Sequence, residues 1–300
     1  MRRRQIADDM TFSALAWGAW RLLDAQHLRG PQDILRLIES LLELGITTVD
    51  HADIYGAYAC EAAFGAALAL DPGLRARLEI VTKCDIAAVC PARPANRVKH
   101  YDTSADYIIA SAEASLCNLG VEQIDVLLIH RPDPLMDADA VAQAFTRLRA
   151  DGKVRHFGVS NFTPFQFDLL QSRLDAPLVT NQVECSVLAG DAISGGTLDQ
   201  MQRLRRVPML WSPLGRLFTD EDDQVRRVRA ALAAVARRMG FDDLATVATA
   251  WLFRLPSTPV VIAGSMRPQH LASMAAATEL VLDRQDWFQI YEALHGEAVP

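Results

Sequence analysis

Short apolar runs alternate with amphipathic stretches along the whole chain. Turn residues bound the apolar runs, which predicts buried strands separated by helices. The predicted strands are residues 12–17, 46–50, 78–83, 124–130, 154–159, 178–183, 207–212 and 259–263. The predicted helices are residues 31–44, 61–70, 104–119, 138–150, 164–172, 198–206, 224–239, 244–255, 268–277 and 284–294.

Strands that alternate with helices predict a parallel sheet connected by crossover helices. Eight such repeats in 300 residues favour the α/β class, as a closed (β/α)₈ TIM barrel. The alternative is an open doubly wound sheet, which usually carries a glycine-rich turn after its first strand. The chain contains no GxGxxG motif, and no linker or low-complexity tract divides it. We therefore expect a single barrel domain over residues 1–300.

Composition narrows the classes of partner. The chain has 30 basic and 37 acidic residues and a net charge of −7, which argues against a nucleic-acid partner. No apolar run reaches the roughly 18 to 20 residues that span a bilayer, so no membrane segment is expected.

Residues 1–9 are basic without a following hydrophobic stretch, so no secretory signal is expected either. The five cysteines form no CxxC pair, which indicates reduced thiols and a cytoplasmic location.

Polar residues end several neighbouring strands of the predicted barrel. Asp50, Lys83 and His130 each stand at the end of a predicted strand, and Tyr55 follows Asp50 by five residues. Because active sites of (β/α)₈ barrels lie at the carboxyl ends of the strands, these side chains are expected on one rim. Adjacent strands are about 4.8 Å apart, so the four residues are expected to be neighbours.

These residue types suit proton transfer to an oxygen. Tyrosine has an ordinary pKa of about 10, which a nearby ammonium group lowers. Asp50 would hold Lys83 charged, and His130 could donate a hydrogen bond to a carbonyl oxygen. Together the four residues could protonate that oxygen while a hydride reaches its carbon.

Other interpretations of the same residues remain open. Asp50 and Lys83 could form only a structural ion pair, or Lys83 could form a Schiff base, as in a lyase. His51 and Asp53 are residue types that bind metals, but no third ligand accompanies them, so no metal site is expected.

The ordered motifs of this chain resemble those of the aldo-keto reductases, and most closely a bacterial branch of general oxidoreductases. The resemblance extends from Gly18 to about Leu271. The motifs that carry it are residues 45–50 (GITTVD), 55–56 (YG), 81–83 (VTK), 128–130 (LIH), 152–162 (GKVRHFGVSNF), 181–184 (NQVE) and 211–215 (WSPLG).

The resemblance implies a role for each matching position. The catalytic residues would be Asp50, Tyr55, Lys83 and His130, with Tyr55 as general acid. Apart from the resemblance, we expect Trp20, Tyr58 and Arg131 to line the substrate pocket. The cofactor-binding residues would be Gly18, Ser160, Asn161, Gln182, Trp211, Ser212, Leu214, Gly215, Arg216, Gly264, Ser265 and Arg267.

The resemblance also implies the activity, an NADPH-dependent reduction of aldehydes and ketones to alcohols. Ser265 and Arg267 suit the 2′-phosphate of the adenosine, so NADPH is expected over NADH. The better-studied members carry Arg, Glu and Asn where this chain has His270, Ser273 and Met274. The expected partner is a small-molecule carbonyl substrate, and the expected state is a monomer or weak homo-oligomer. The alternatives are an NADP(H)-binding regulatory protein with slow turnover and the Schiff-base lyase.

Overall fold

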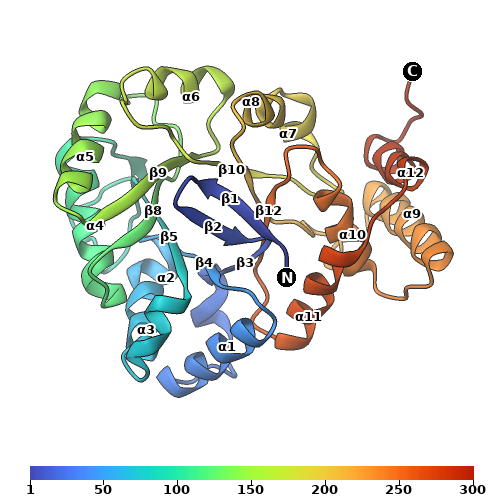
Figure 1. The fold of residues 1–300 in the computed structure, drawn as a ribbon, viewed down its shortest axis with the longest axis horizontal. Coiled ribbons are helices and arrows are strands. Elements are labelled where there is room, and N and C mark those ends of the chain that lie inside the picture. The colour runs from blue at the N-terminus through green and yellow to red at the C-terminus, as the bar shows by residue number, and fades with distance from the viewer. The chain divides into compact units, whose positions relative to one another are not determined.

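The computed structural model describes residues 1–300, and its main feature is a closed barrel of eight strands (Figure 1). The strands follow one another around the barrel in the order β10-β11-β12-β3-β4-β5-β8-β9. The predicted (β/α)₈ barrel is therefore confirmed. The barrel strands are β3 (Leu15–Gly18), β4 (Thr48–Asp50), β5 (Glu79–Cys84), β8 (Ile124–Ile129), β9 (Val154–Ser160), β10 (Asn181–Glu184), β11 (Met209–Trp211) and β12 (Val260–Ala263).

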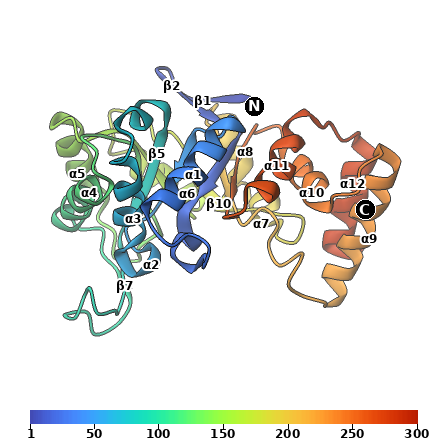
Figure 2. The ribbon, with the colours of Figure 1, turned by 90° about the horizontal axis from the view of Figure 1, so that it is seen from below.

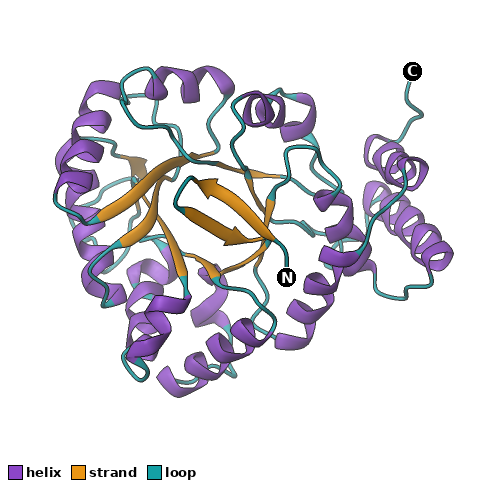
Figure 3. Cartoon of the chain, viewed as in Figure 1, coloured by secondary structure: helices purple, strands orange, loops and turns teal.

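Helices alternate with these strands along the chain (Figure 3). None of the helices is both long and apolar enough to cross a membrane. The longer helices are α1 (Pro31–Glu43), α3 (Cys60–Leu68), α4 (Ala105–Leu119), α5 (Ala138–Ala150), α6 (Pro164–Gln171), α8 (Thr197–Arg203), α9 (Asp223–Met239), α10 (Leu244–Phe253), α11 (Pro268–Ala276) and α12 (Arg284–His295).

The structure differs from the predicted elements at several places. Residues 12–17 are divided between two strands, because β2 (Met10–Ser13) pairs antiparallel with β1 (Arg3–Ala7) and β3 begins only at Leu15. A second small hairpin, β6 (Ile86–Ala87) with β7 (His100–Tyr101), follows β5. The one-turn helices α2 (Tyr55–Tyr58) and α7 (Asp191–Ser194) were also not predicted.

The contacts within the chain group the residues into two compact units. The first unit comprises residues 1–16, 183–263 and 267–300, and the second comprises residues 17–182 and 264–266. We describe each unit by itself.

The second unit has a core of consecutive parallel strands. Val81 of β5 pairs with Val126 of β8, and Ile129 of β8 pairs with Val159 of β9. Every residue of β8 is buried, as expected for a strand that is covered on both faces. The strand-to-strand spacing is close enough that a Cβ at Gly158 would lie 2.8 Å from the backbone oxygen of Thr180. The parallel register of β4 with β5 and of β5 with β8 brings the carboxyl ends of these strands, which carry the candidate catalytic residues, to one edge.

The first unit contains α7 to α12 and the strands β11 and β12. In it, α10 and α12 are joined by two tryptophans whose rings stack with centroids 4.9 Å apart. Nε1 of Trp251 donates to the backbone oxygen of Trp287 at 3.0 Å, and Nε1 of Trp287 donates to the backbone oxygen of Trp251 at 3.1 Å. The reciprocal hydrogen bonds satisfy both indole groups in a largely buried contact.

Candidate active site

Lys83 is the centre of the polar cluster at the carboxyl ends of β4, β5 and β8. Its side chain is fully buried at the end of β5. Its Nζ donates to Oδ2 of Asp50 at 2.8 Å, to the backbone oxygen of His51 at 2.7 Å and to the hydroxyl of Tyr55 at 3.2 Å. An ammonium group has three N–H donors, so these partners satisfy all of them.

The charges around Lys83 decide its protonation. Burial alone would lower its pKa, but the negative charge of Asp50, together with Tyr55 and the hydrogen bonds to both residues, raises the pKa above its ordinary value. Lys83 is therefore a buried cation paired with the Asp50 carboxylate.

The pKa of Tyr55 differs from the value that the sequence predicts. The Lys83 ammonium does act to lower the pKa of Tyr55, as predicted. Burial of the phenol has a larger and opposite effect, so the pKa of Tyr55 lies above its ordinary value. The sequence could not give this result because burial depends on the packing around the strand ends. The hydroxyl remains protonated at neutral pH.

His130 presents a neutral imidazole beside Tyr55. The two rings meet edge to face, with centroids 6.0 Å apart. Burial and the positive charges of Lys83, Arg131 and Lys99 hold the pKa of His130 well below its usual range. A neutral imidazole donates one hydrogen bond, which fits a group that contacts a carbonyl oxygen.

The predicted nicotinamide contacts join the same hydrogen-bond network. Nε2 of Gln182 donates to Oδ1 of Asp50 at 2.7 Å. Nδ2 of Asn161 donates to the Ser160 hydroxyl at 2.8 Å, and that hydroxyl donates to the backbone oxygen of Gln182 at 2.9 Å. A continuous network therefore links Asn161 through Gln182 and Asp50 to Lys83. Its hydroxyl and amide groups are the donor and acceptor types that suit a carboxamide.

Three other cofactor candidates, Gly18, Gly264 and Ser265, lie in this unit. The backbone oxygen of Ser265 accepts a hydrogen bond from Nε1 of Trp17 at 3.0 Å, which ties residue 265 to the strand that ends at Gly18. Gly264 has open space where a side chain would begin, since nothing lies within 4 Å of a Cβ built there.

The remaining cofactor candidates, Trp211, Ser212, Leu214, Gly215, Arg216 and Arg267, belong to the first unit. A tight turn follows β11, in which the backbone N–H of Gly215 donates to the backbone oxygen of Ser212 at 2.8 Å. Ser212 and Gly215 both have positive φ, 51° and 50°. This turn is formed by the residues that resemble a phosphate-binding loop.

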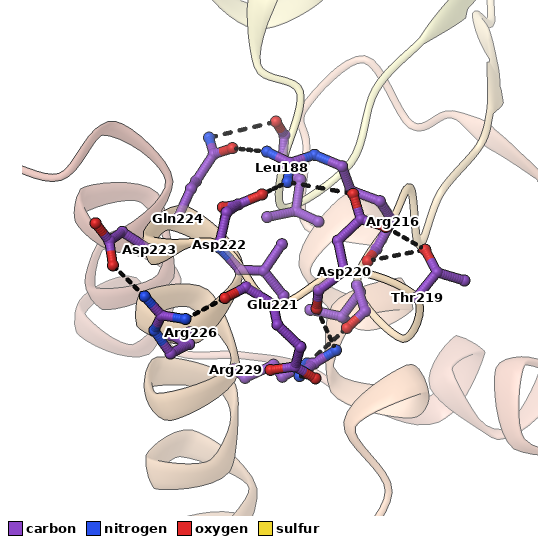
Figure 4. Close-up of polar contacts among 12 residues, drawn as sticks. Leu188, Arg216, Thr219, Asp220, Glu221, Asp222, Asp223, Gln224, Arg226 and Arg229 are labelled. Carbon is purple, nitrogen blue, oxygen red and sulfur yellow. Dashed lines mark hydrogen bonds and ion pairs between the residues drawn. The ribbon is translucent and has the colours of Figure 1, made fainter.

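Arg216 is held by side chains of the loop that follows it and of the first turn of α9 (Figure 4). Its guanidinium pairs with Asp222, lies 3.7 Å from Oδ2 of Asp220 and donates to Oε1 of Gln224 at 2.6 Å. Gln224 in turn donates to the backbone oxygen of Leu294 at 3.1 Å. Arg216 thus has two carboxylates as its present partners, and an incoming phosphate would compete with them.

Two of the predicted substrate residues, Trp20 and Tyr58, differ in their exposure and in their contacts. Trp20 is 60% exposed and lies under the Arg21 guanidinium, 5.3 Å from the ring centroid. Tyr58 uses its hydroxyl to hold the β6–β7 hairpin, donating to the backbone oxygen of Ile86 at 2.9 Å and accepting from the N–H of Ala88 at 3.0 Å. The Tyr58 hydroxyl is therefore already engaged within the chain.

Two buried carboxyl groups lie beside the cluster: Asp85, which was not singled out from the sequence, and Asp53, which was considered there only as a metal ligand. Asp85 follows Lys83 by two residues and is fully buried, and burial raises its pKa to about 9. Neither side-chain oxygen of Asp53 has a hydrogen-bond partner, and burial raises its pKa to about 7, with a further contribution from Glu61. Asp85 lies one residue beyond the end of β5, so no strand spacing in the sequence indicated its position.

His51 packs against aromatic side chains and has no contact that indicates a metal site. Its ring packs edge to face against Phe64, with centroids 4.5 Å apart, and against Trp17 at 6.2 Å. Burial lowers its pKa to about 3, so the imidazole is neutral. His51 is therefore enclosed by aromatic side chains.

Comparison with known proteins shows the family of this chain. Residues 14–295 match the model of the aldo/keto reductase family. The chain is 52% identical over 291 residues to the oxidoreductase YdhF of Escherichia coli (strain K12), covering 96% of each chain. It is 44% identical over 301 residues to a 6-dehydroglucose reductase of Agrobacterium fabrum, covering 100% of each.

The fold is shared with solved structures. An aldo/keto reductase from Klebsiella pneumoniae in complex with NADP and acetate superposes with a TM-score of 0.80 at 22% identity, over 99% of this chain and 96% of the other. This likeness concerns the barrel fold alone. The family match and the relatives show that the chain is an NAD(P)H-dependent oxidoreductase and belongs to the aldo/keto reductase family.

Proposed function

We propose that the protein is an NADPH-dependent carbonyl reductase that converts aldehydes or ketones to alcohols. The observation that carries the proposal is the Tyr55 hydroxyl, 3.2 Å from Nζ of Lys83, which is itself 2.8 Å from Oδ2 of Asp50. A protonated phenol with a cation beside it can give its proton to a carbonyl oxygen and is then stabilised as the phenolate.

The cofactor fits the donor groups of the chain. When bound, the reduced nicotinamide supplies the hydride for the carbonyl carbon. Ser160, Asn161 and Gln182 would bind its carboxamide, and Trp211 would lie under its ring. Ser265 and Arg267 would bind the 2′-phosphate, since a hydroxyl and a guanidinium suit a phosphate, and this favours NADPH over NADH.

Each catalytic residue then has one task. His130, as a neutral imidazole, donates a hydrogen bond that orients the carbonyl oxygen. Tyr55 donates its proton to that oxygen as negative charge develops on it. Lys83 stabilises the resulting phenolate, and Asp50 holds Lys83 in place with the help of Gln182.

The Schiff-base alternative conflicts with the state of Lys83. A lysine must lose its proton to attack a carbonyl carbon. Interactions with Asp50 and Tyr55 raise the pKa of Lys83, and all three of its N–H groups have partners. A borohydride trapping experiment that labelled Lys83 in the presence of substrate would revive this alternative.

The substrate panel follows from two relatives. Proteins named 6-dehydroglucose reductase are 44% and 38% identical to this chain, so an oxidised sugar belongs in the first panel beside simple aldehydes and dicarbonyls. A cytoplasmic monomer or weak homo-oligomer remains a prediction of the sequence.

The test is NADPH oxidation by the wild type and Tyr55→Phe, with NADH run in parallel. Tyr55→Phe should lower turnover by about 100-fold or more, while the NADPH dissociation constant measured by fluorescence stays the same. Tyr291→Phe, which alters a tyrosine on α12, is the matched control and should keep wild-type turnover. Binding of NADPH without turnover would favour the regulatory alternative, and turnover that survives in Tyr55→Phe would refute the proposal.

A further inference from the structure

A pocket of about 330 Å³ lies within the first unit. It is lined by residues of α7 and α8, by the segment that joins α10 to β12, and by the start of α12. Pockets that bind small molecules usually measure about 300 to 1,000 Å³, so this one has room for a small ligand. None of its lining residues is a candidate catalytic, substrate or cofactor-binding residue, so a ligand here would contact residues to which the proposed reaction gives no role.

The start of α12 supplies an aromatic wall. Arg284, Trp287 and Phe288 are spaced by three and four residues, which places them on one side of the helix. The rings of Trp287 and Phe288 meet edge to face, with centroids 5.1 Å apart. Figure 2 shows α12 lying along α9, and the Trp287 ring also stacks on Trp251 of α10. The aromatic wall is therefore held in place by packing within the unit before any ligand binds.

Aliphatic side chains continue this apolar surface. Ile193 of α7, Leu198 of α8 and Leu255, which follows the end of α10, also line the pocket. Aromatic and aliphatic side chains together form the usual surface for the apolar body of a ligand. The shape-determining part of the lining thus suits a small aromatic molecule.

Two arginines give the pocket an excess of positive charge. Arg254 and Arg284 line it, are exposed and form no ion pair. Asp199 is the one acidic residue of the lining. Arg254 uses only its Nε, which donates to the backbone oxygen of Leu282 at 3.2 Å. A guanidinium has five N–H groups, so most donors of both arginines are available to an anion.

Ser257 adds an unsatisfied polar group to the same wall. The residue is only 5% exposed, and its hydroxyl has no hydrogen-bond partner within the chain. Most buried hydroxyl groups are hydrogen-bonded, so a group from outside the chain, a ligand atom or a water, would complete this wall.

We propose that this pocket binds a small aromatic molecule that carries one anionic group, a carboxylate or a sulfonate. The aromatic body would lie against Trp287 and Phe288. The anion would pair with Arg254 and Arg284, whose two charges less that of Asp199 leave one positive charge to neutralise. This binding site is independent of the proposed carbonyl reductase function.

The test compares two fluorescent probes with the same rings and different charge, 8-anilinonaphthalene-1-sulfonate and N-phenyl-1-naphthylamine. Both should bind the wild type with NADP⁺ present in excess. An Arg254→Gln/Arg284→Gln double variant should raise the dissociation constant of the sulfonate about tenfold, since two surface ion pairs are lost. The same variant should change that of the uncharged amine by less than about twofold. Ile193→Trp, which places a larger side chain in the pocket, should weaken the binding of both probes.

Arg227→Gln/Arg237→Gln is the matched control. Both arginines are exposed on α9 and lie outside the pocket lining. Arg237 resembles Arg254 in donating through Nε to a backbone oxygen, that of Ala233 at 3.3 Å. This variant should bind both probes as the wild type does.

Four results would overturn the inference. An equal loss of sulfonate affinity in the control would indicate a general charge effect, and displacement of the sulfonate by NADP⁺ would place the probe in the cofactor site. Unchanged sulfonate affinity in the pocket double variant, or equal weakening of both probes there, would remove the anion contact. Binding of both probes that Ile193→Trp leaves unchanged would show that they lie elsewhere on the protein.

Discussion

The side chain of Asp85 holds the backbone of Arg131, with 2.9 Å between Oδ2 and the amide nitrogen. Asp85 adopts φ of 105°, a conformation that is rare for a residue other than glycine. Since Arg131 directly follows His130, this hydrogen bond fixes the path of the chain that presents the imidazole. Asp85 is thus a positioning residue for His130.

Replacing Asp85 should therefore affect turnover without touching the reacting groups. Asp85→Ala removes the acceptor, and we expect kcat/KM to fall by about tenfold, the equivalent of one buried hydrogen bond. Asp85→Asn keeps an acceptor oxygen and should recover most of this loss. Asp71→Ala is the control, because Asp71 also accepts a backbone N–H, that of Gly73 at 3.0 Å, but lies before β5. Equal activity of Asp85→Ala and wild type would refute the positioning role.

The buried carboxyl of Asp85 also makes stability depend on pH. Its folded pKa is about 9 and its ordinary value is 3.8, so between these values the folded state holds a proton that the unfolded state has lost. The free energy of unfolding should then decrease as pH rises through this range. Asp53, with a folded pKa of about 7, adds to the decrease below pH 7, where His51, with a folded pKa of about 3, opposes it.

The clean window is therefore about pH 7 to 8, where Asp85 dominates. Closer to pH 9 the buried thiols of Cys60, Cys84 and Cys185 add to the decline, because their folded pKa values lie above the ordinary value of 9.0. Urea unfolding should show wild-type stability falling across this window and Asp85→Asn changing less. An identical decline in the two proteins would contradict the raised pKa of Asp85.

Arg216 leads to a prediction about cofactor affinity, which assumes that it binds the pyrophosphate. Its partner Asp222 is also the N-cap of α9, where its side chain accepts from the N–H of Val225. Asp222→Asn keeps a capping side chain but removes the negative charge that competes with a phosphate. We expect the NADPH dissociation constant, measured by fluorescence at low salt, to fall about threefold.

Asp223→Asn provides the comparison for Asp222. Asp223 is an exposed carboxylate that pairs with Arg226 on the same helix and does not contact Arg216 (Figure 4). This variant should bind NADPH as the wild type does. An equal gain in both variants would indicate a general charge effect instead of competition at Arg216.

The barrel could be predicted because buried parallel strands appear as continuous apolar runs. The hairpin of β1 and β2 could not be predicted, since residues 3–7 are mostly polar. Part of their pairing partner, β2, was also assigned to the predicted strand at residues 12–17. Ser13 is the last residue of β2, and its hydroxyl donates to the backbone oxygen of Leu15 at 2.7 Å, where the chain passes into the next strand. A local pattern does not reveal such a break.

In the candidate active site, likewise, the sequence predicts where the residues lie but not what surrounds their side chains. The ends of strands gave the positions of Asp50, Lys83 and His130, because topology alone brings them to one rim. The raised pKa of Tyr55 and the engagement of the Tyr58 hydroxyl depend on tertiary packing, which no spacing rule contains.

Gly65 in α3 is where local preference and packing disagree most clearly. Alanine is favoured over glycine inside a helix by about 1 kcal/mol, so propensity alone predicts that Gly65→Ala stabilises the protein. A Cβ at this position, however, would lie 2.2 Å from the backbone oxygen of Asn118 and 2.8 Å from the carbonyl carbon of Leu119, at the end of α4. Backbone atoms cannot move aside as a flexible side chain can, so the two helices would have to separate.

We therefore expect Gly65→Ala to lower the free energy of unfolding by about 2 kcal/mol, measured by urea titration. Gly30→Ala is the control, because nothing lies within 4 Å of a Cβ there and φ is −178°. That change should alter the free energy of unfolding by less than about 1 kcal/mol. A stabilised Gly65→Ala would mean that α3 and α4 can move apart at little cost. Since α3 begins five residues after Tyr55, a destabilised variant that still folds should also show lower turnover.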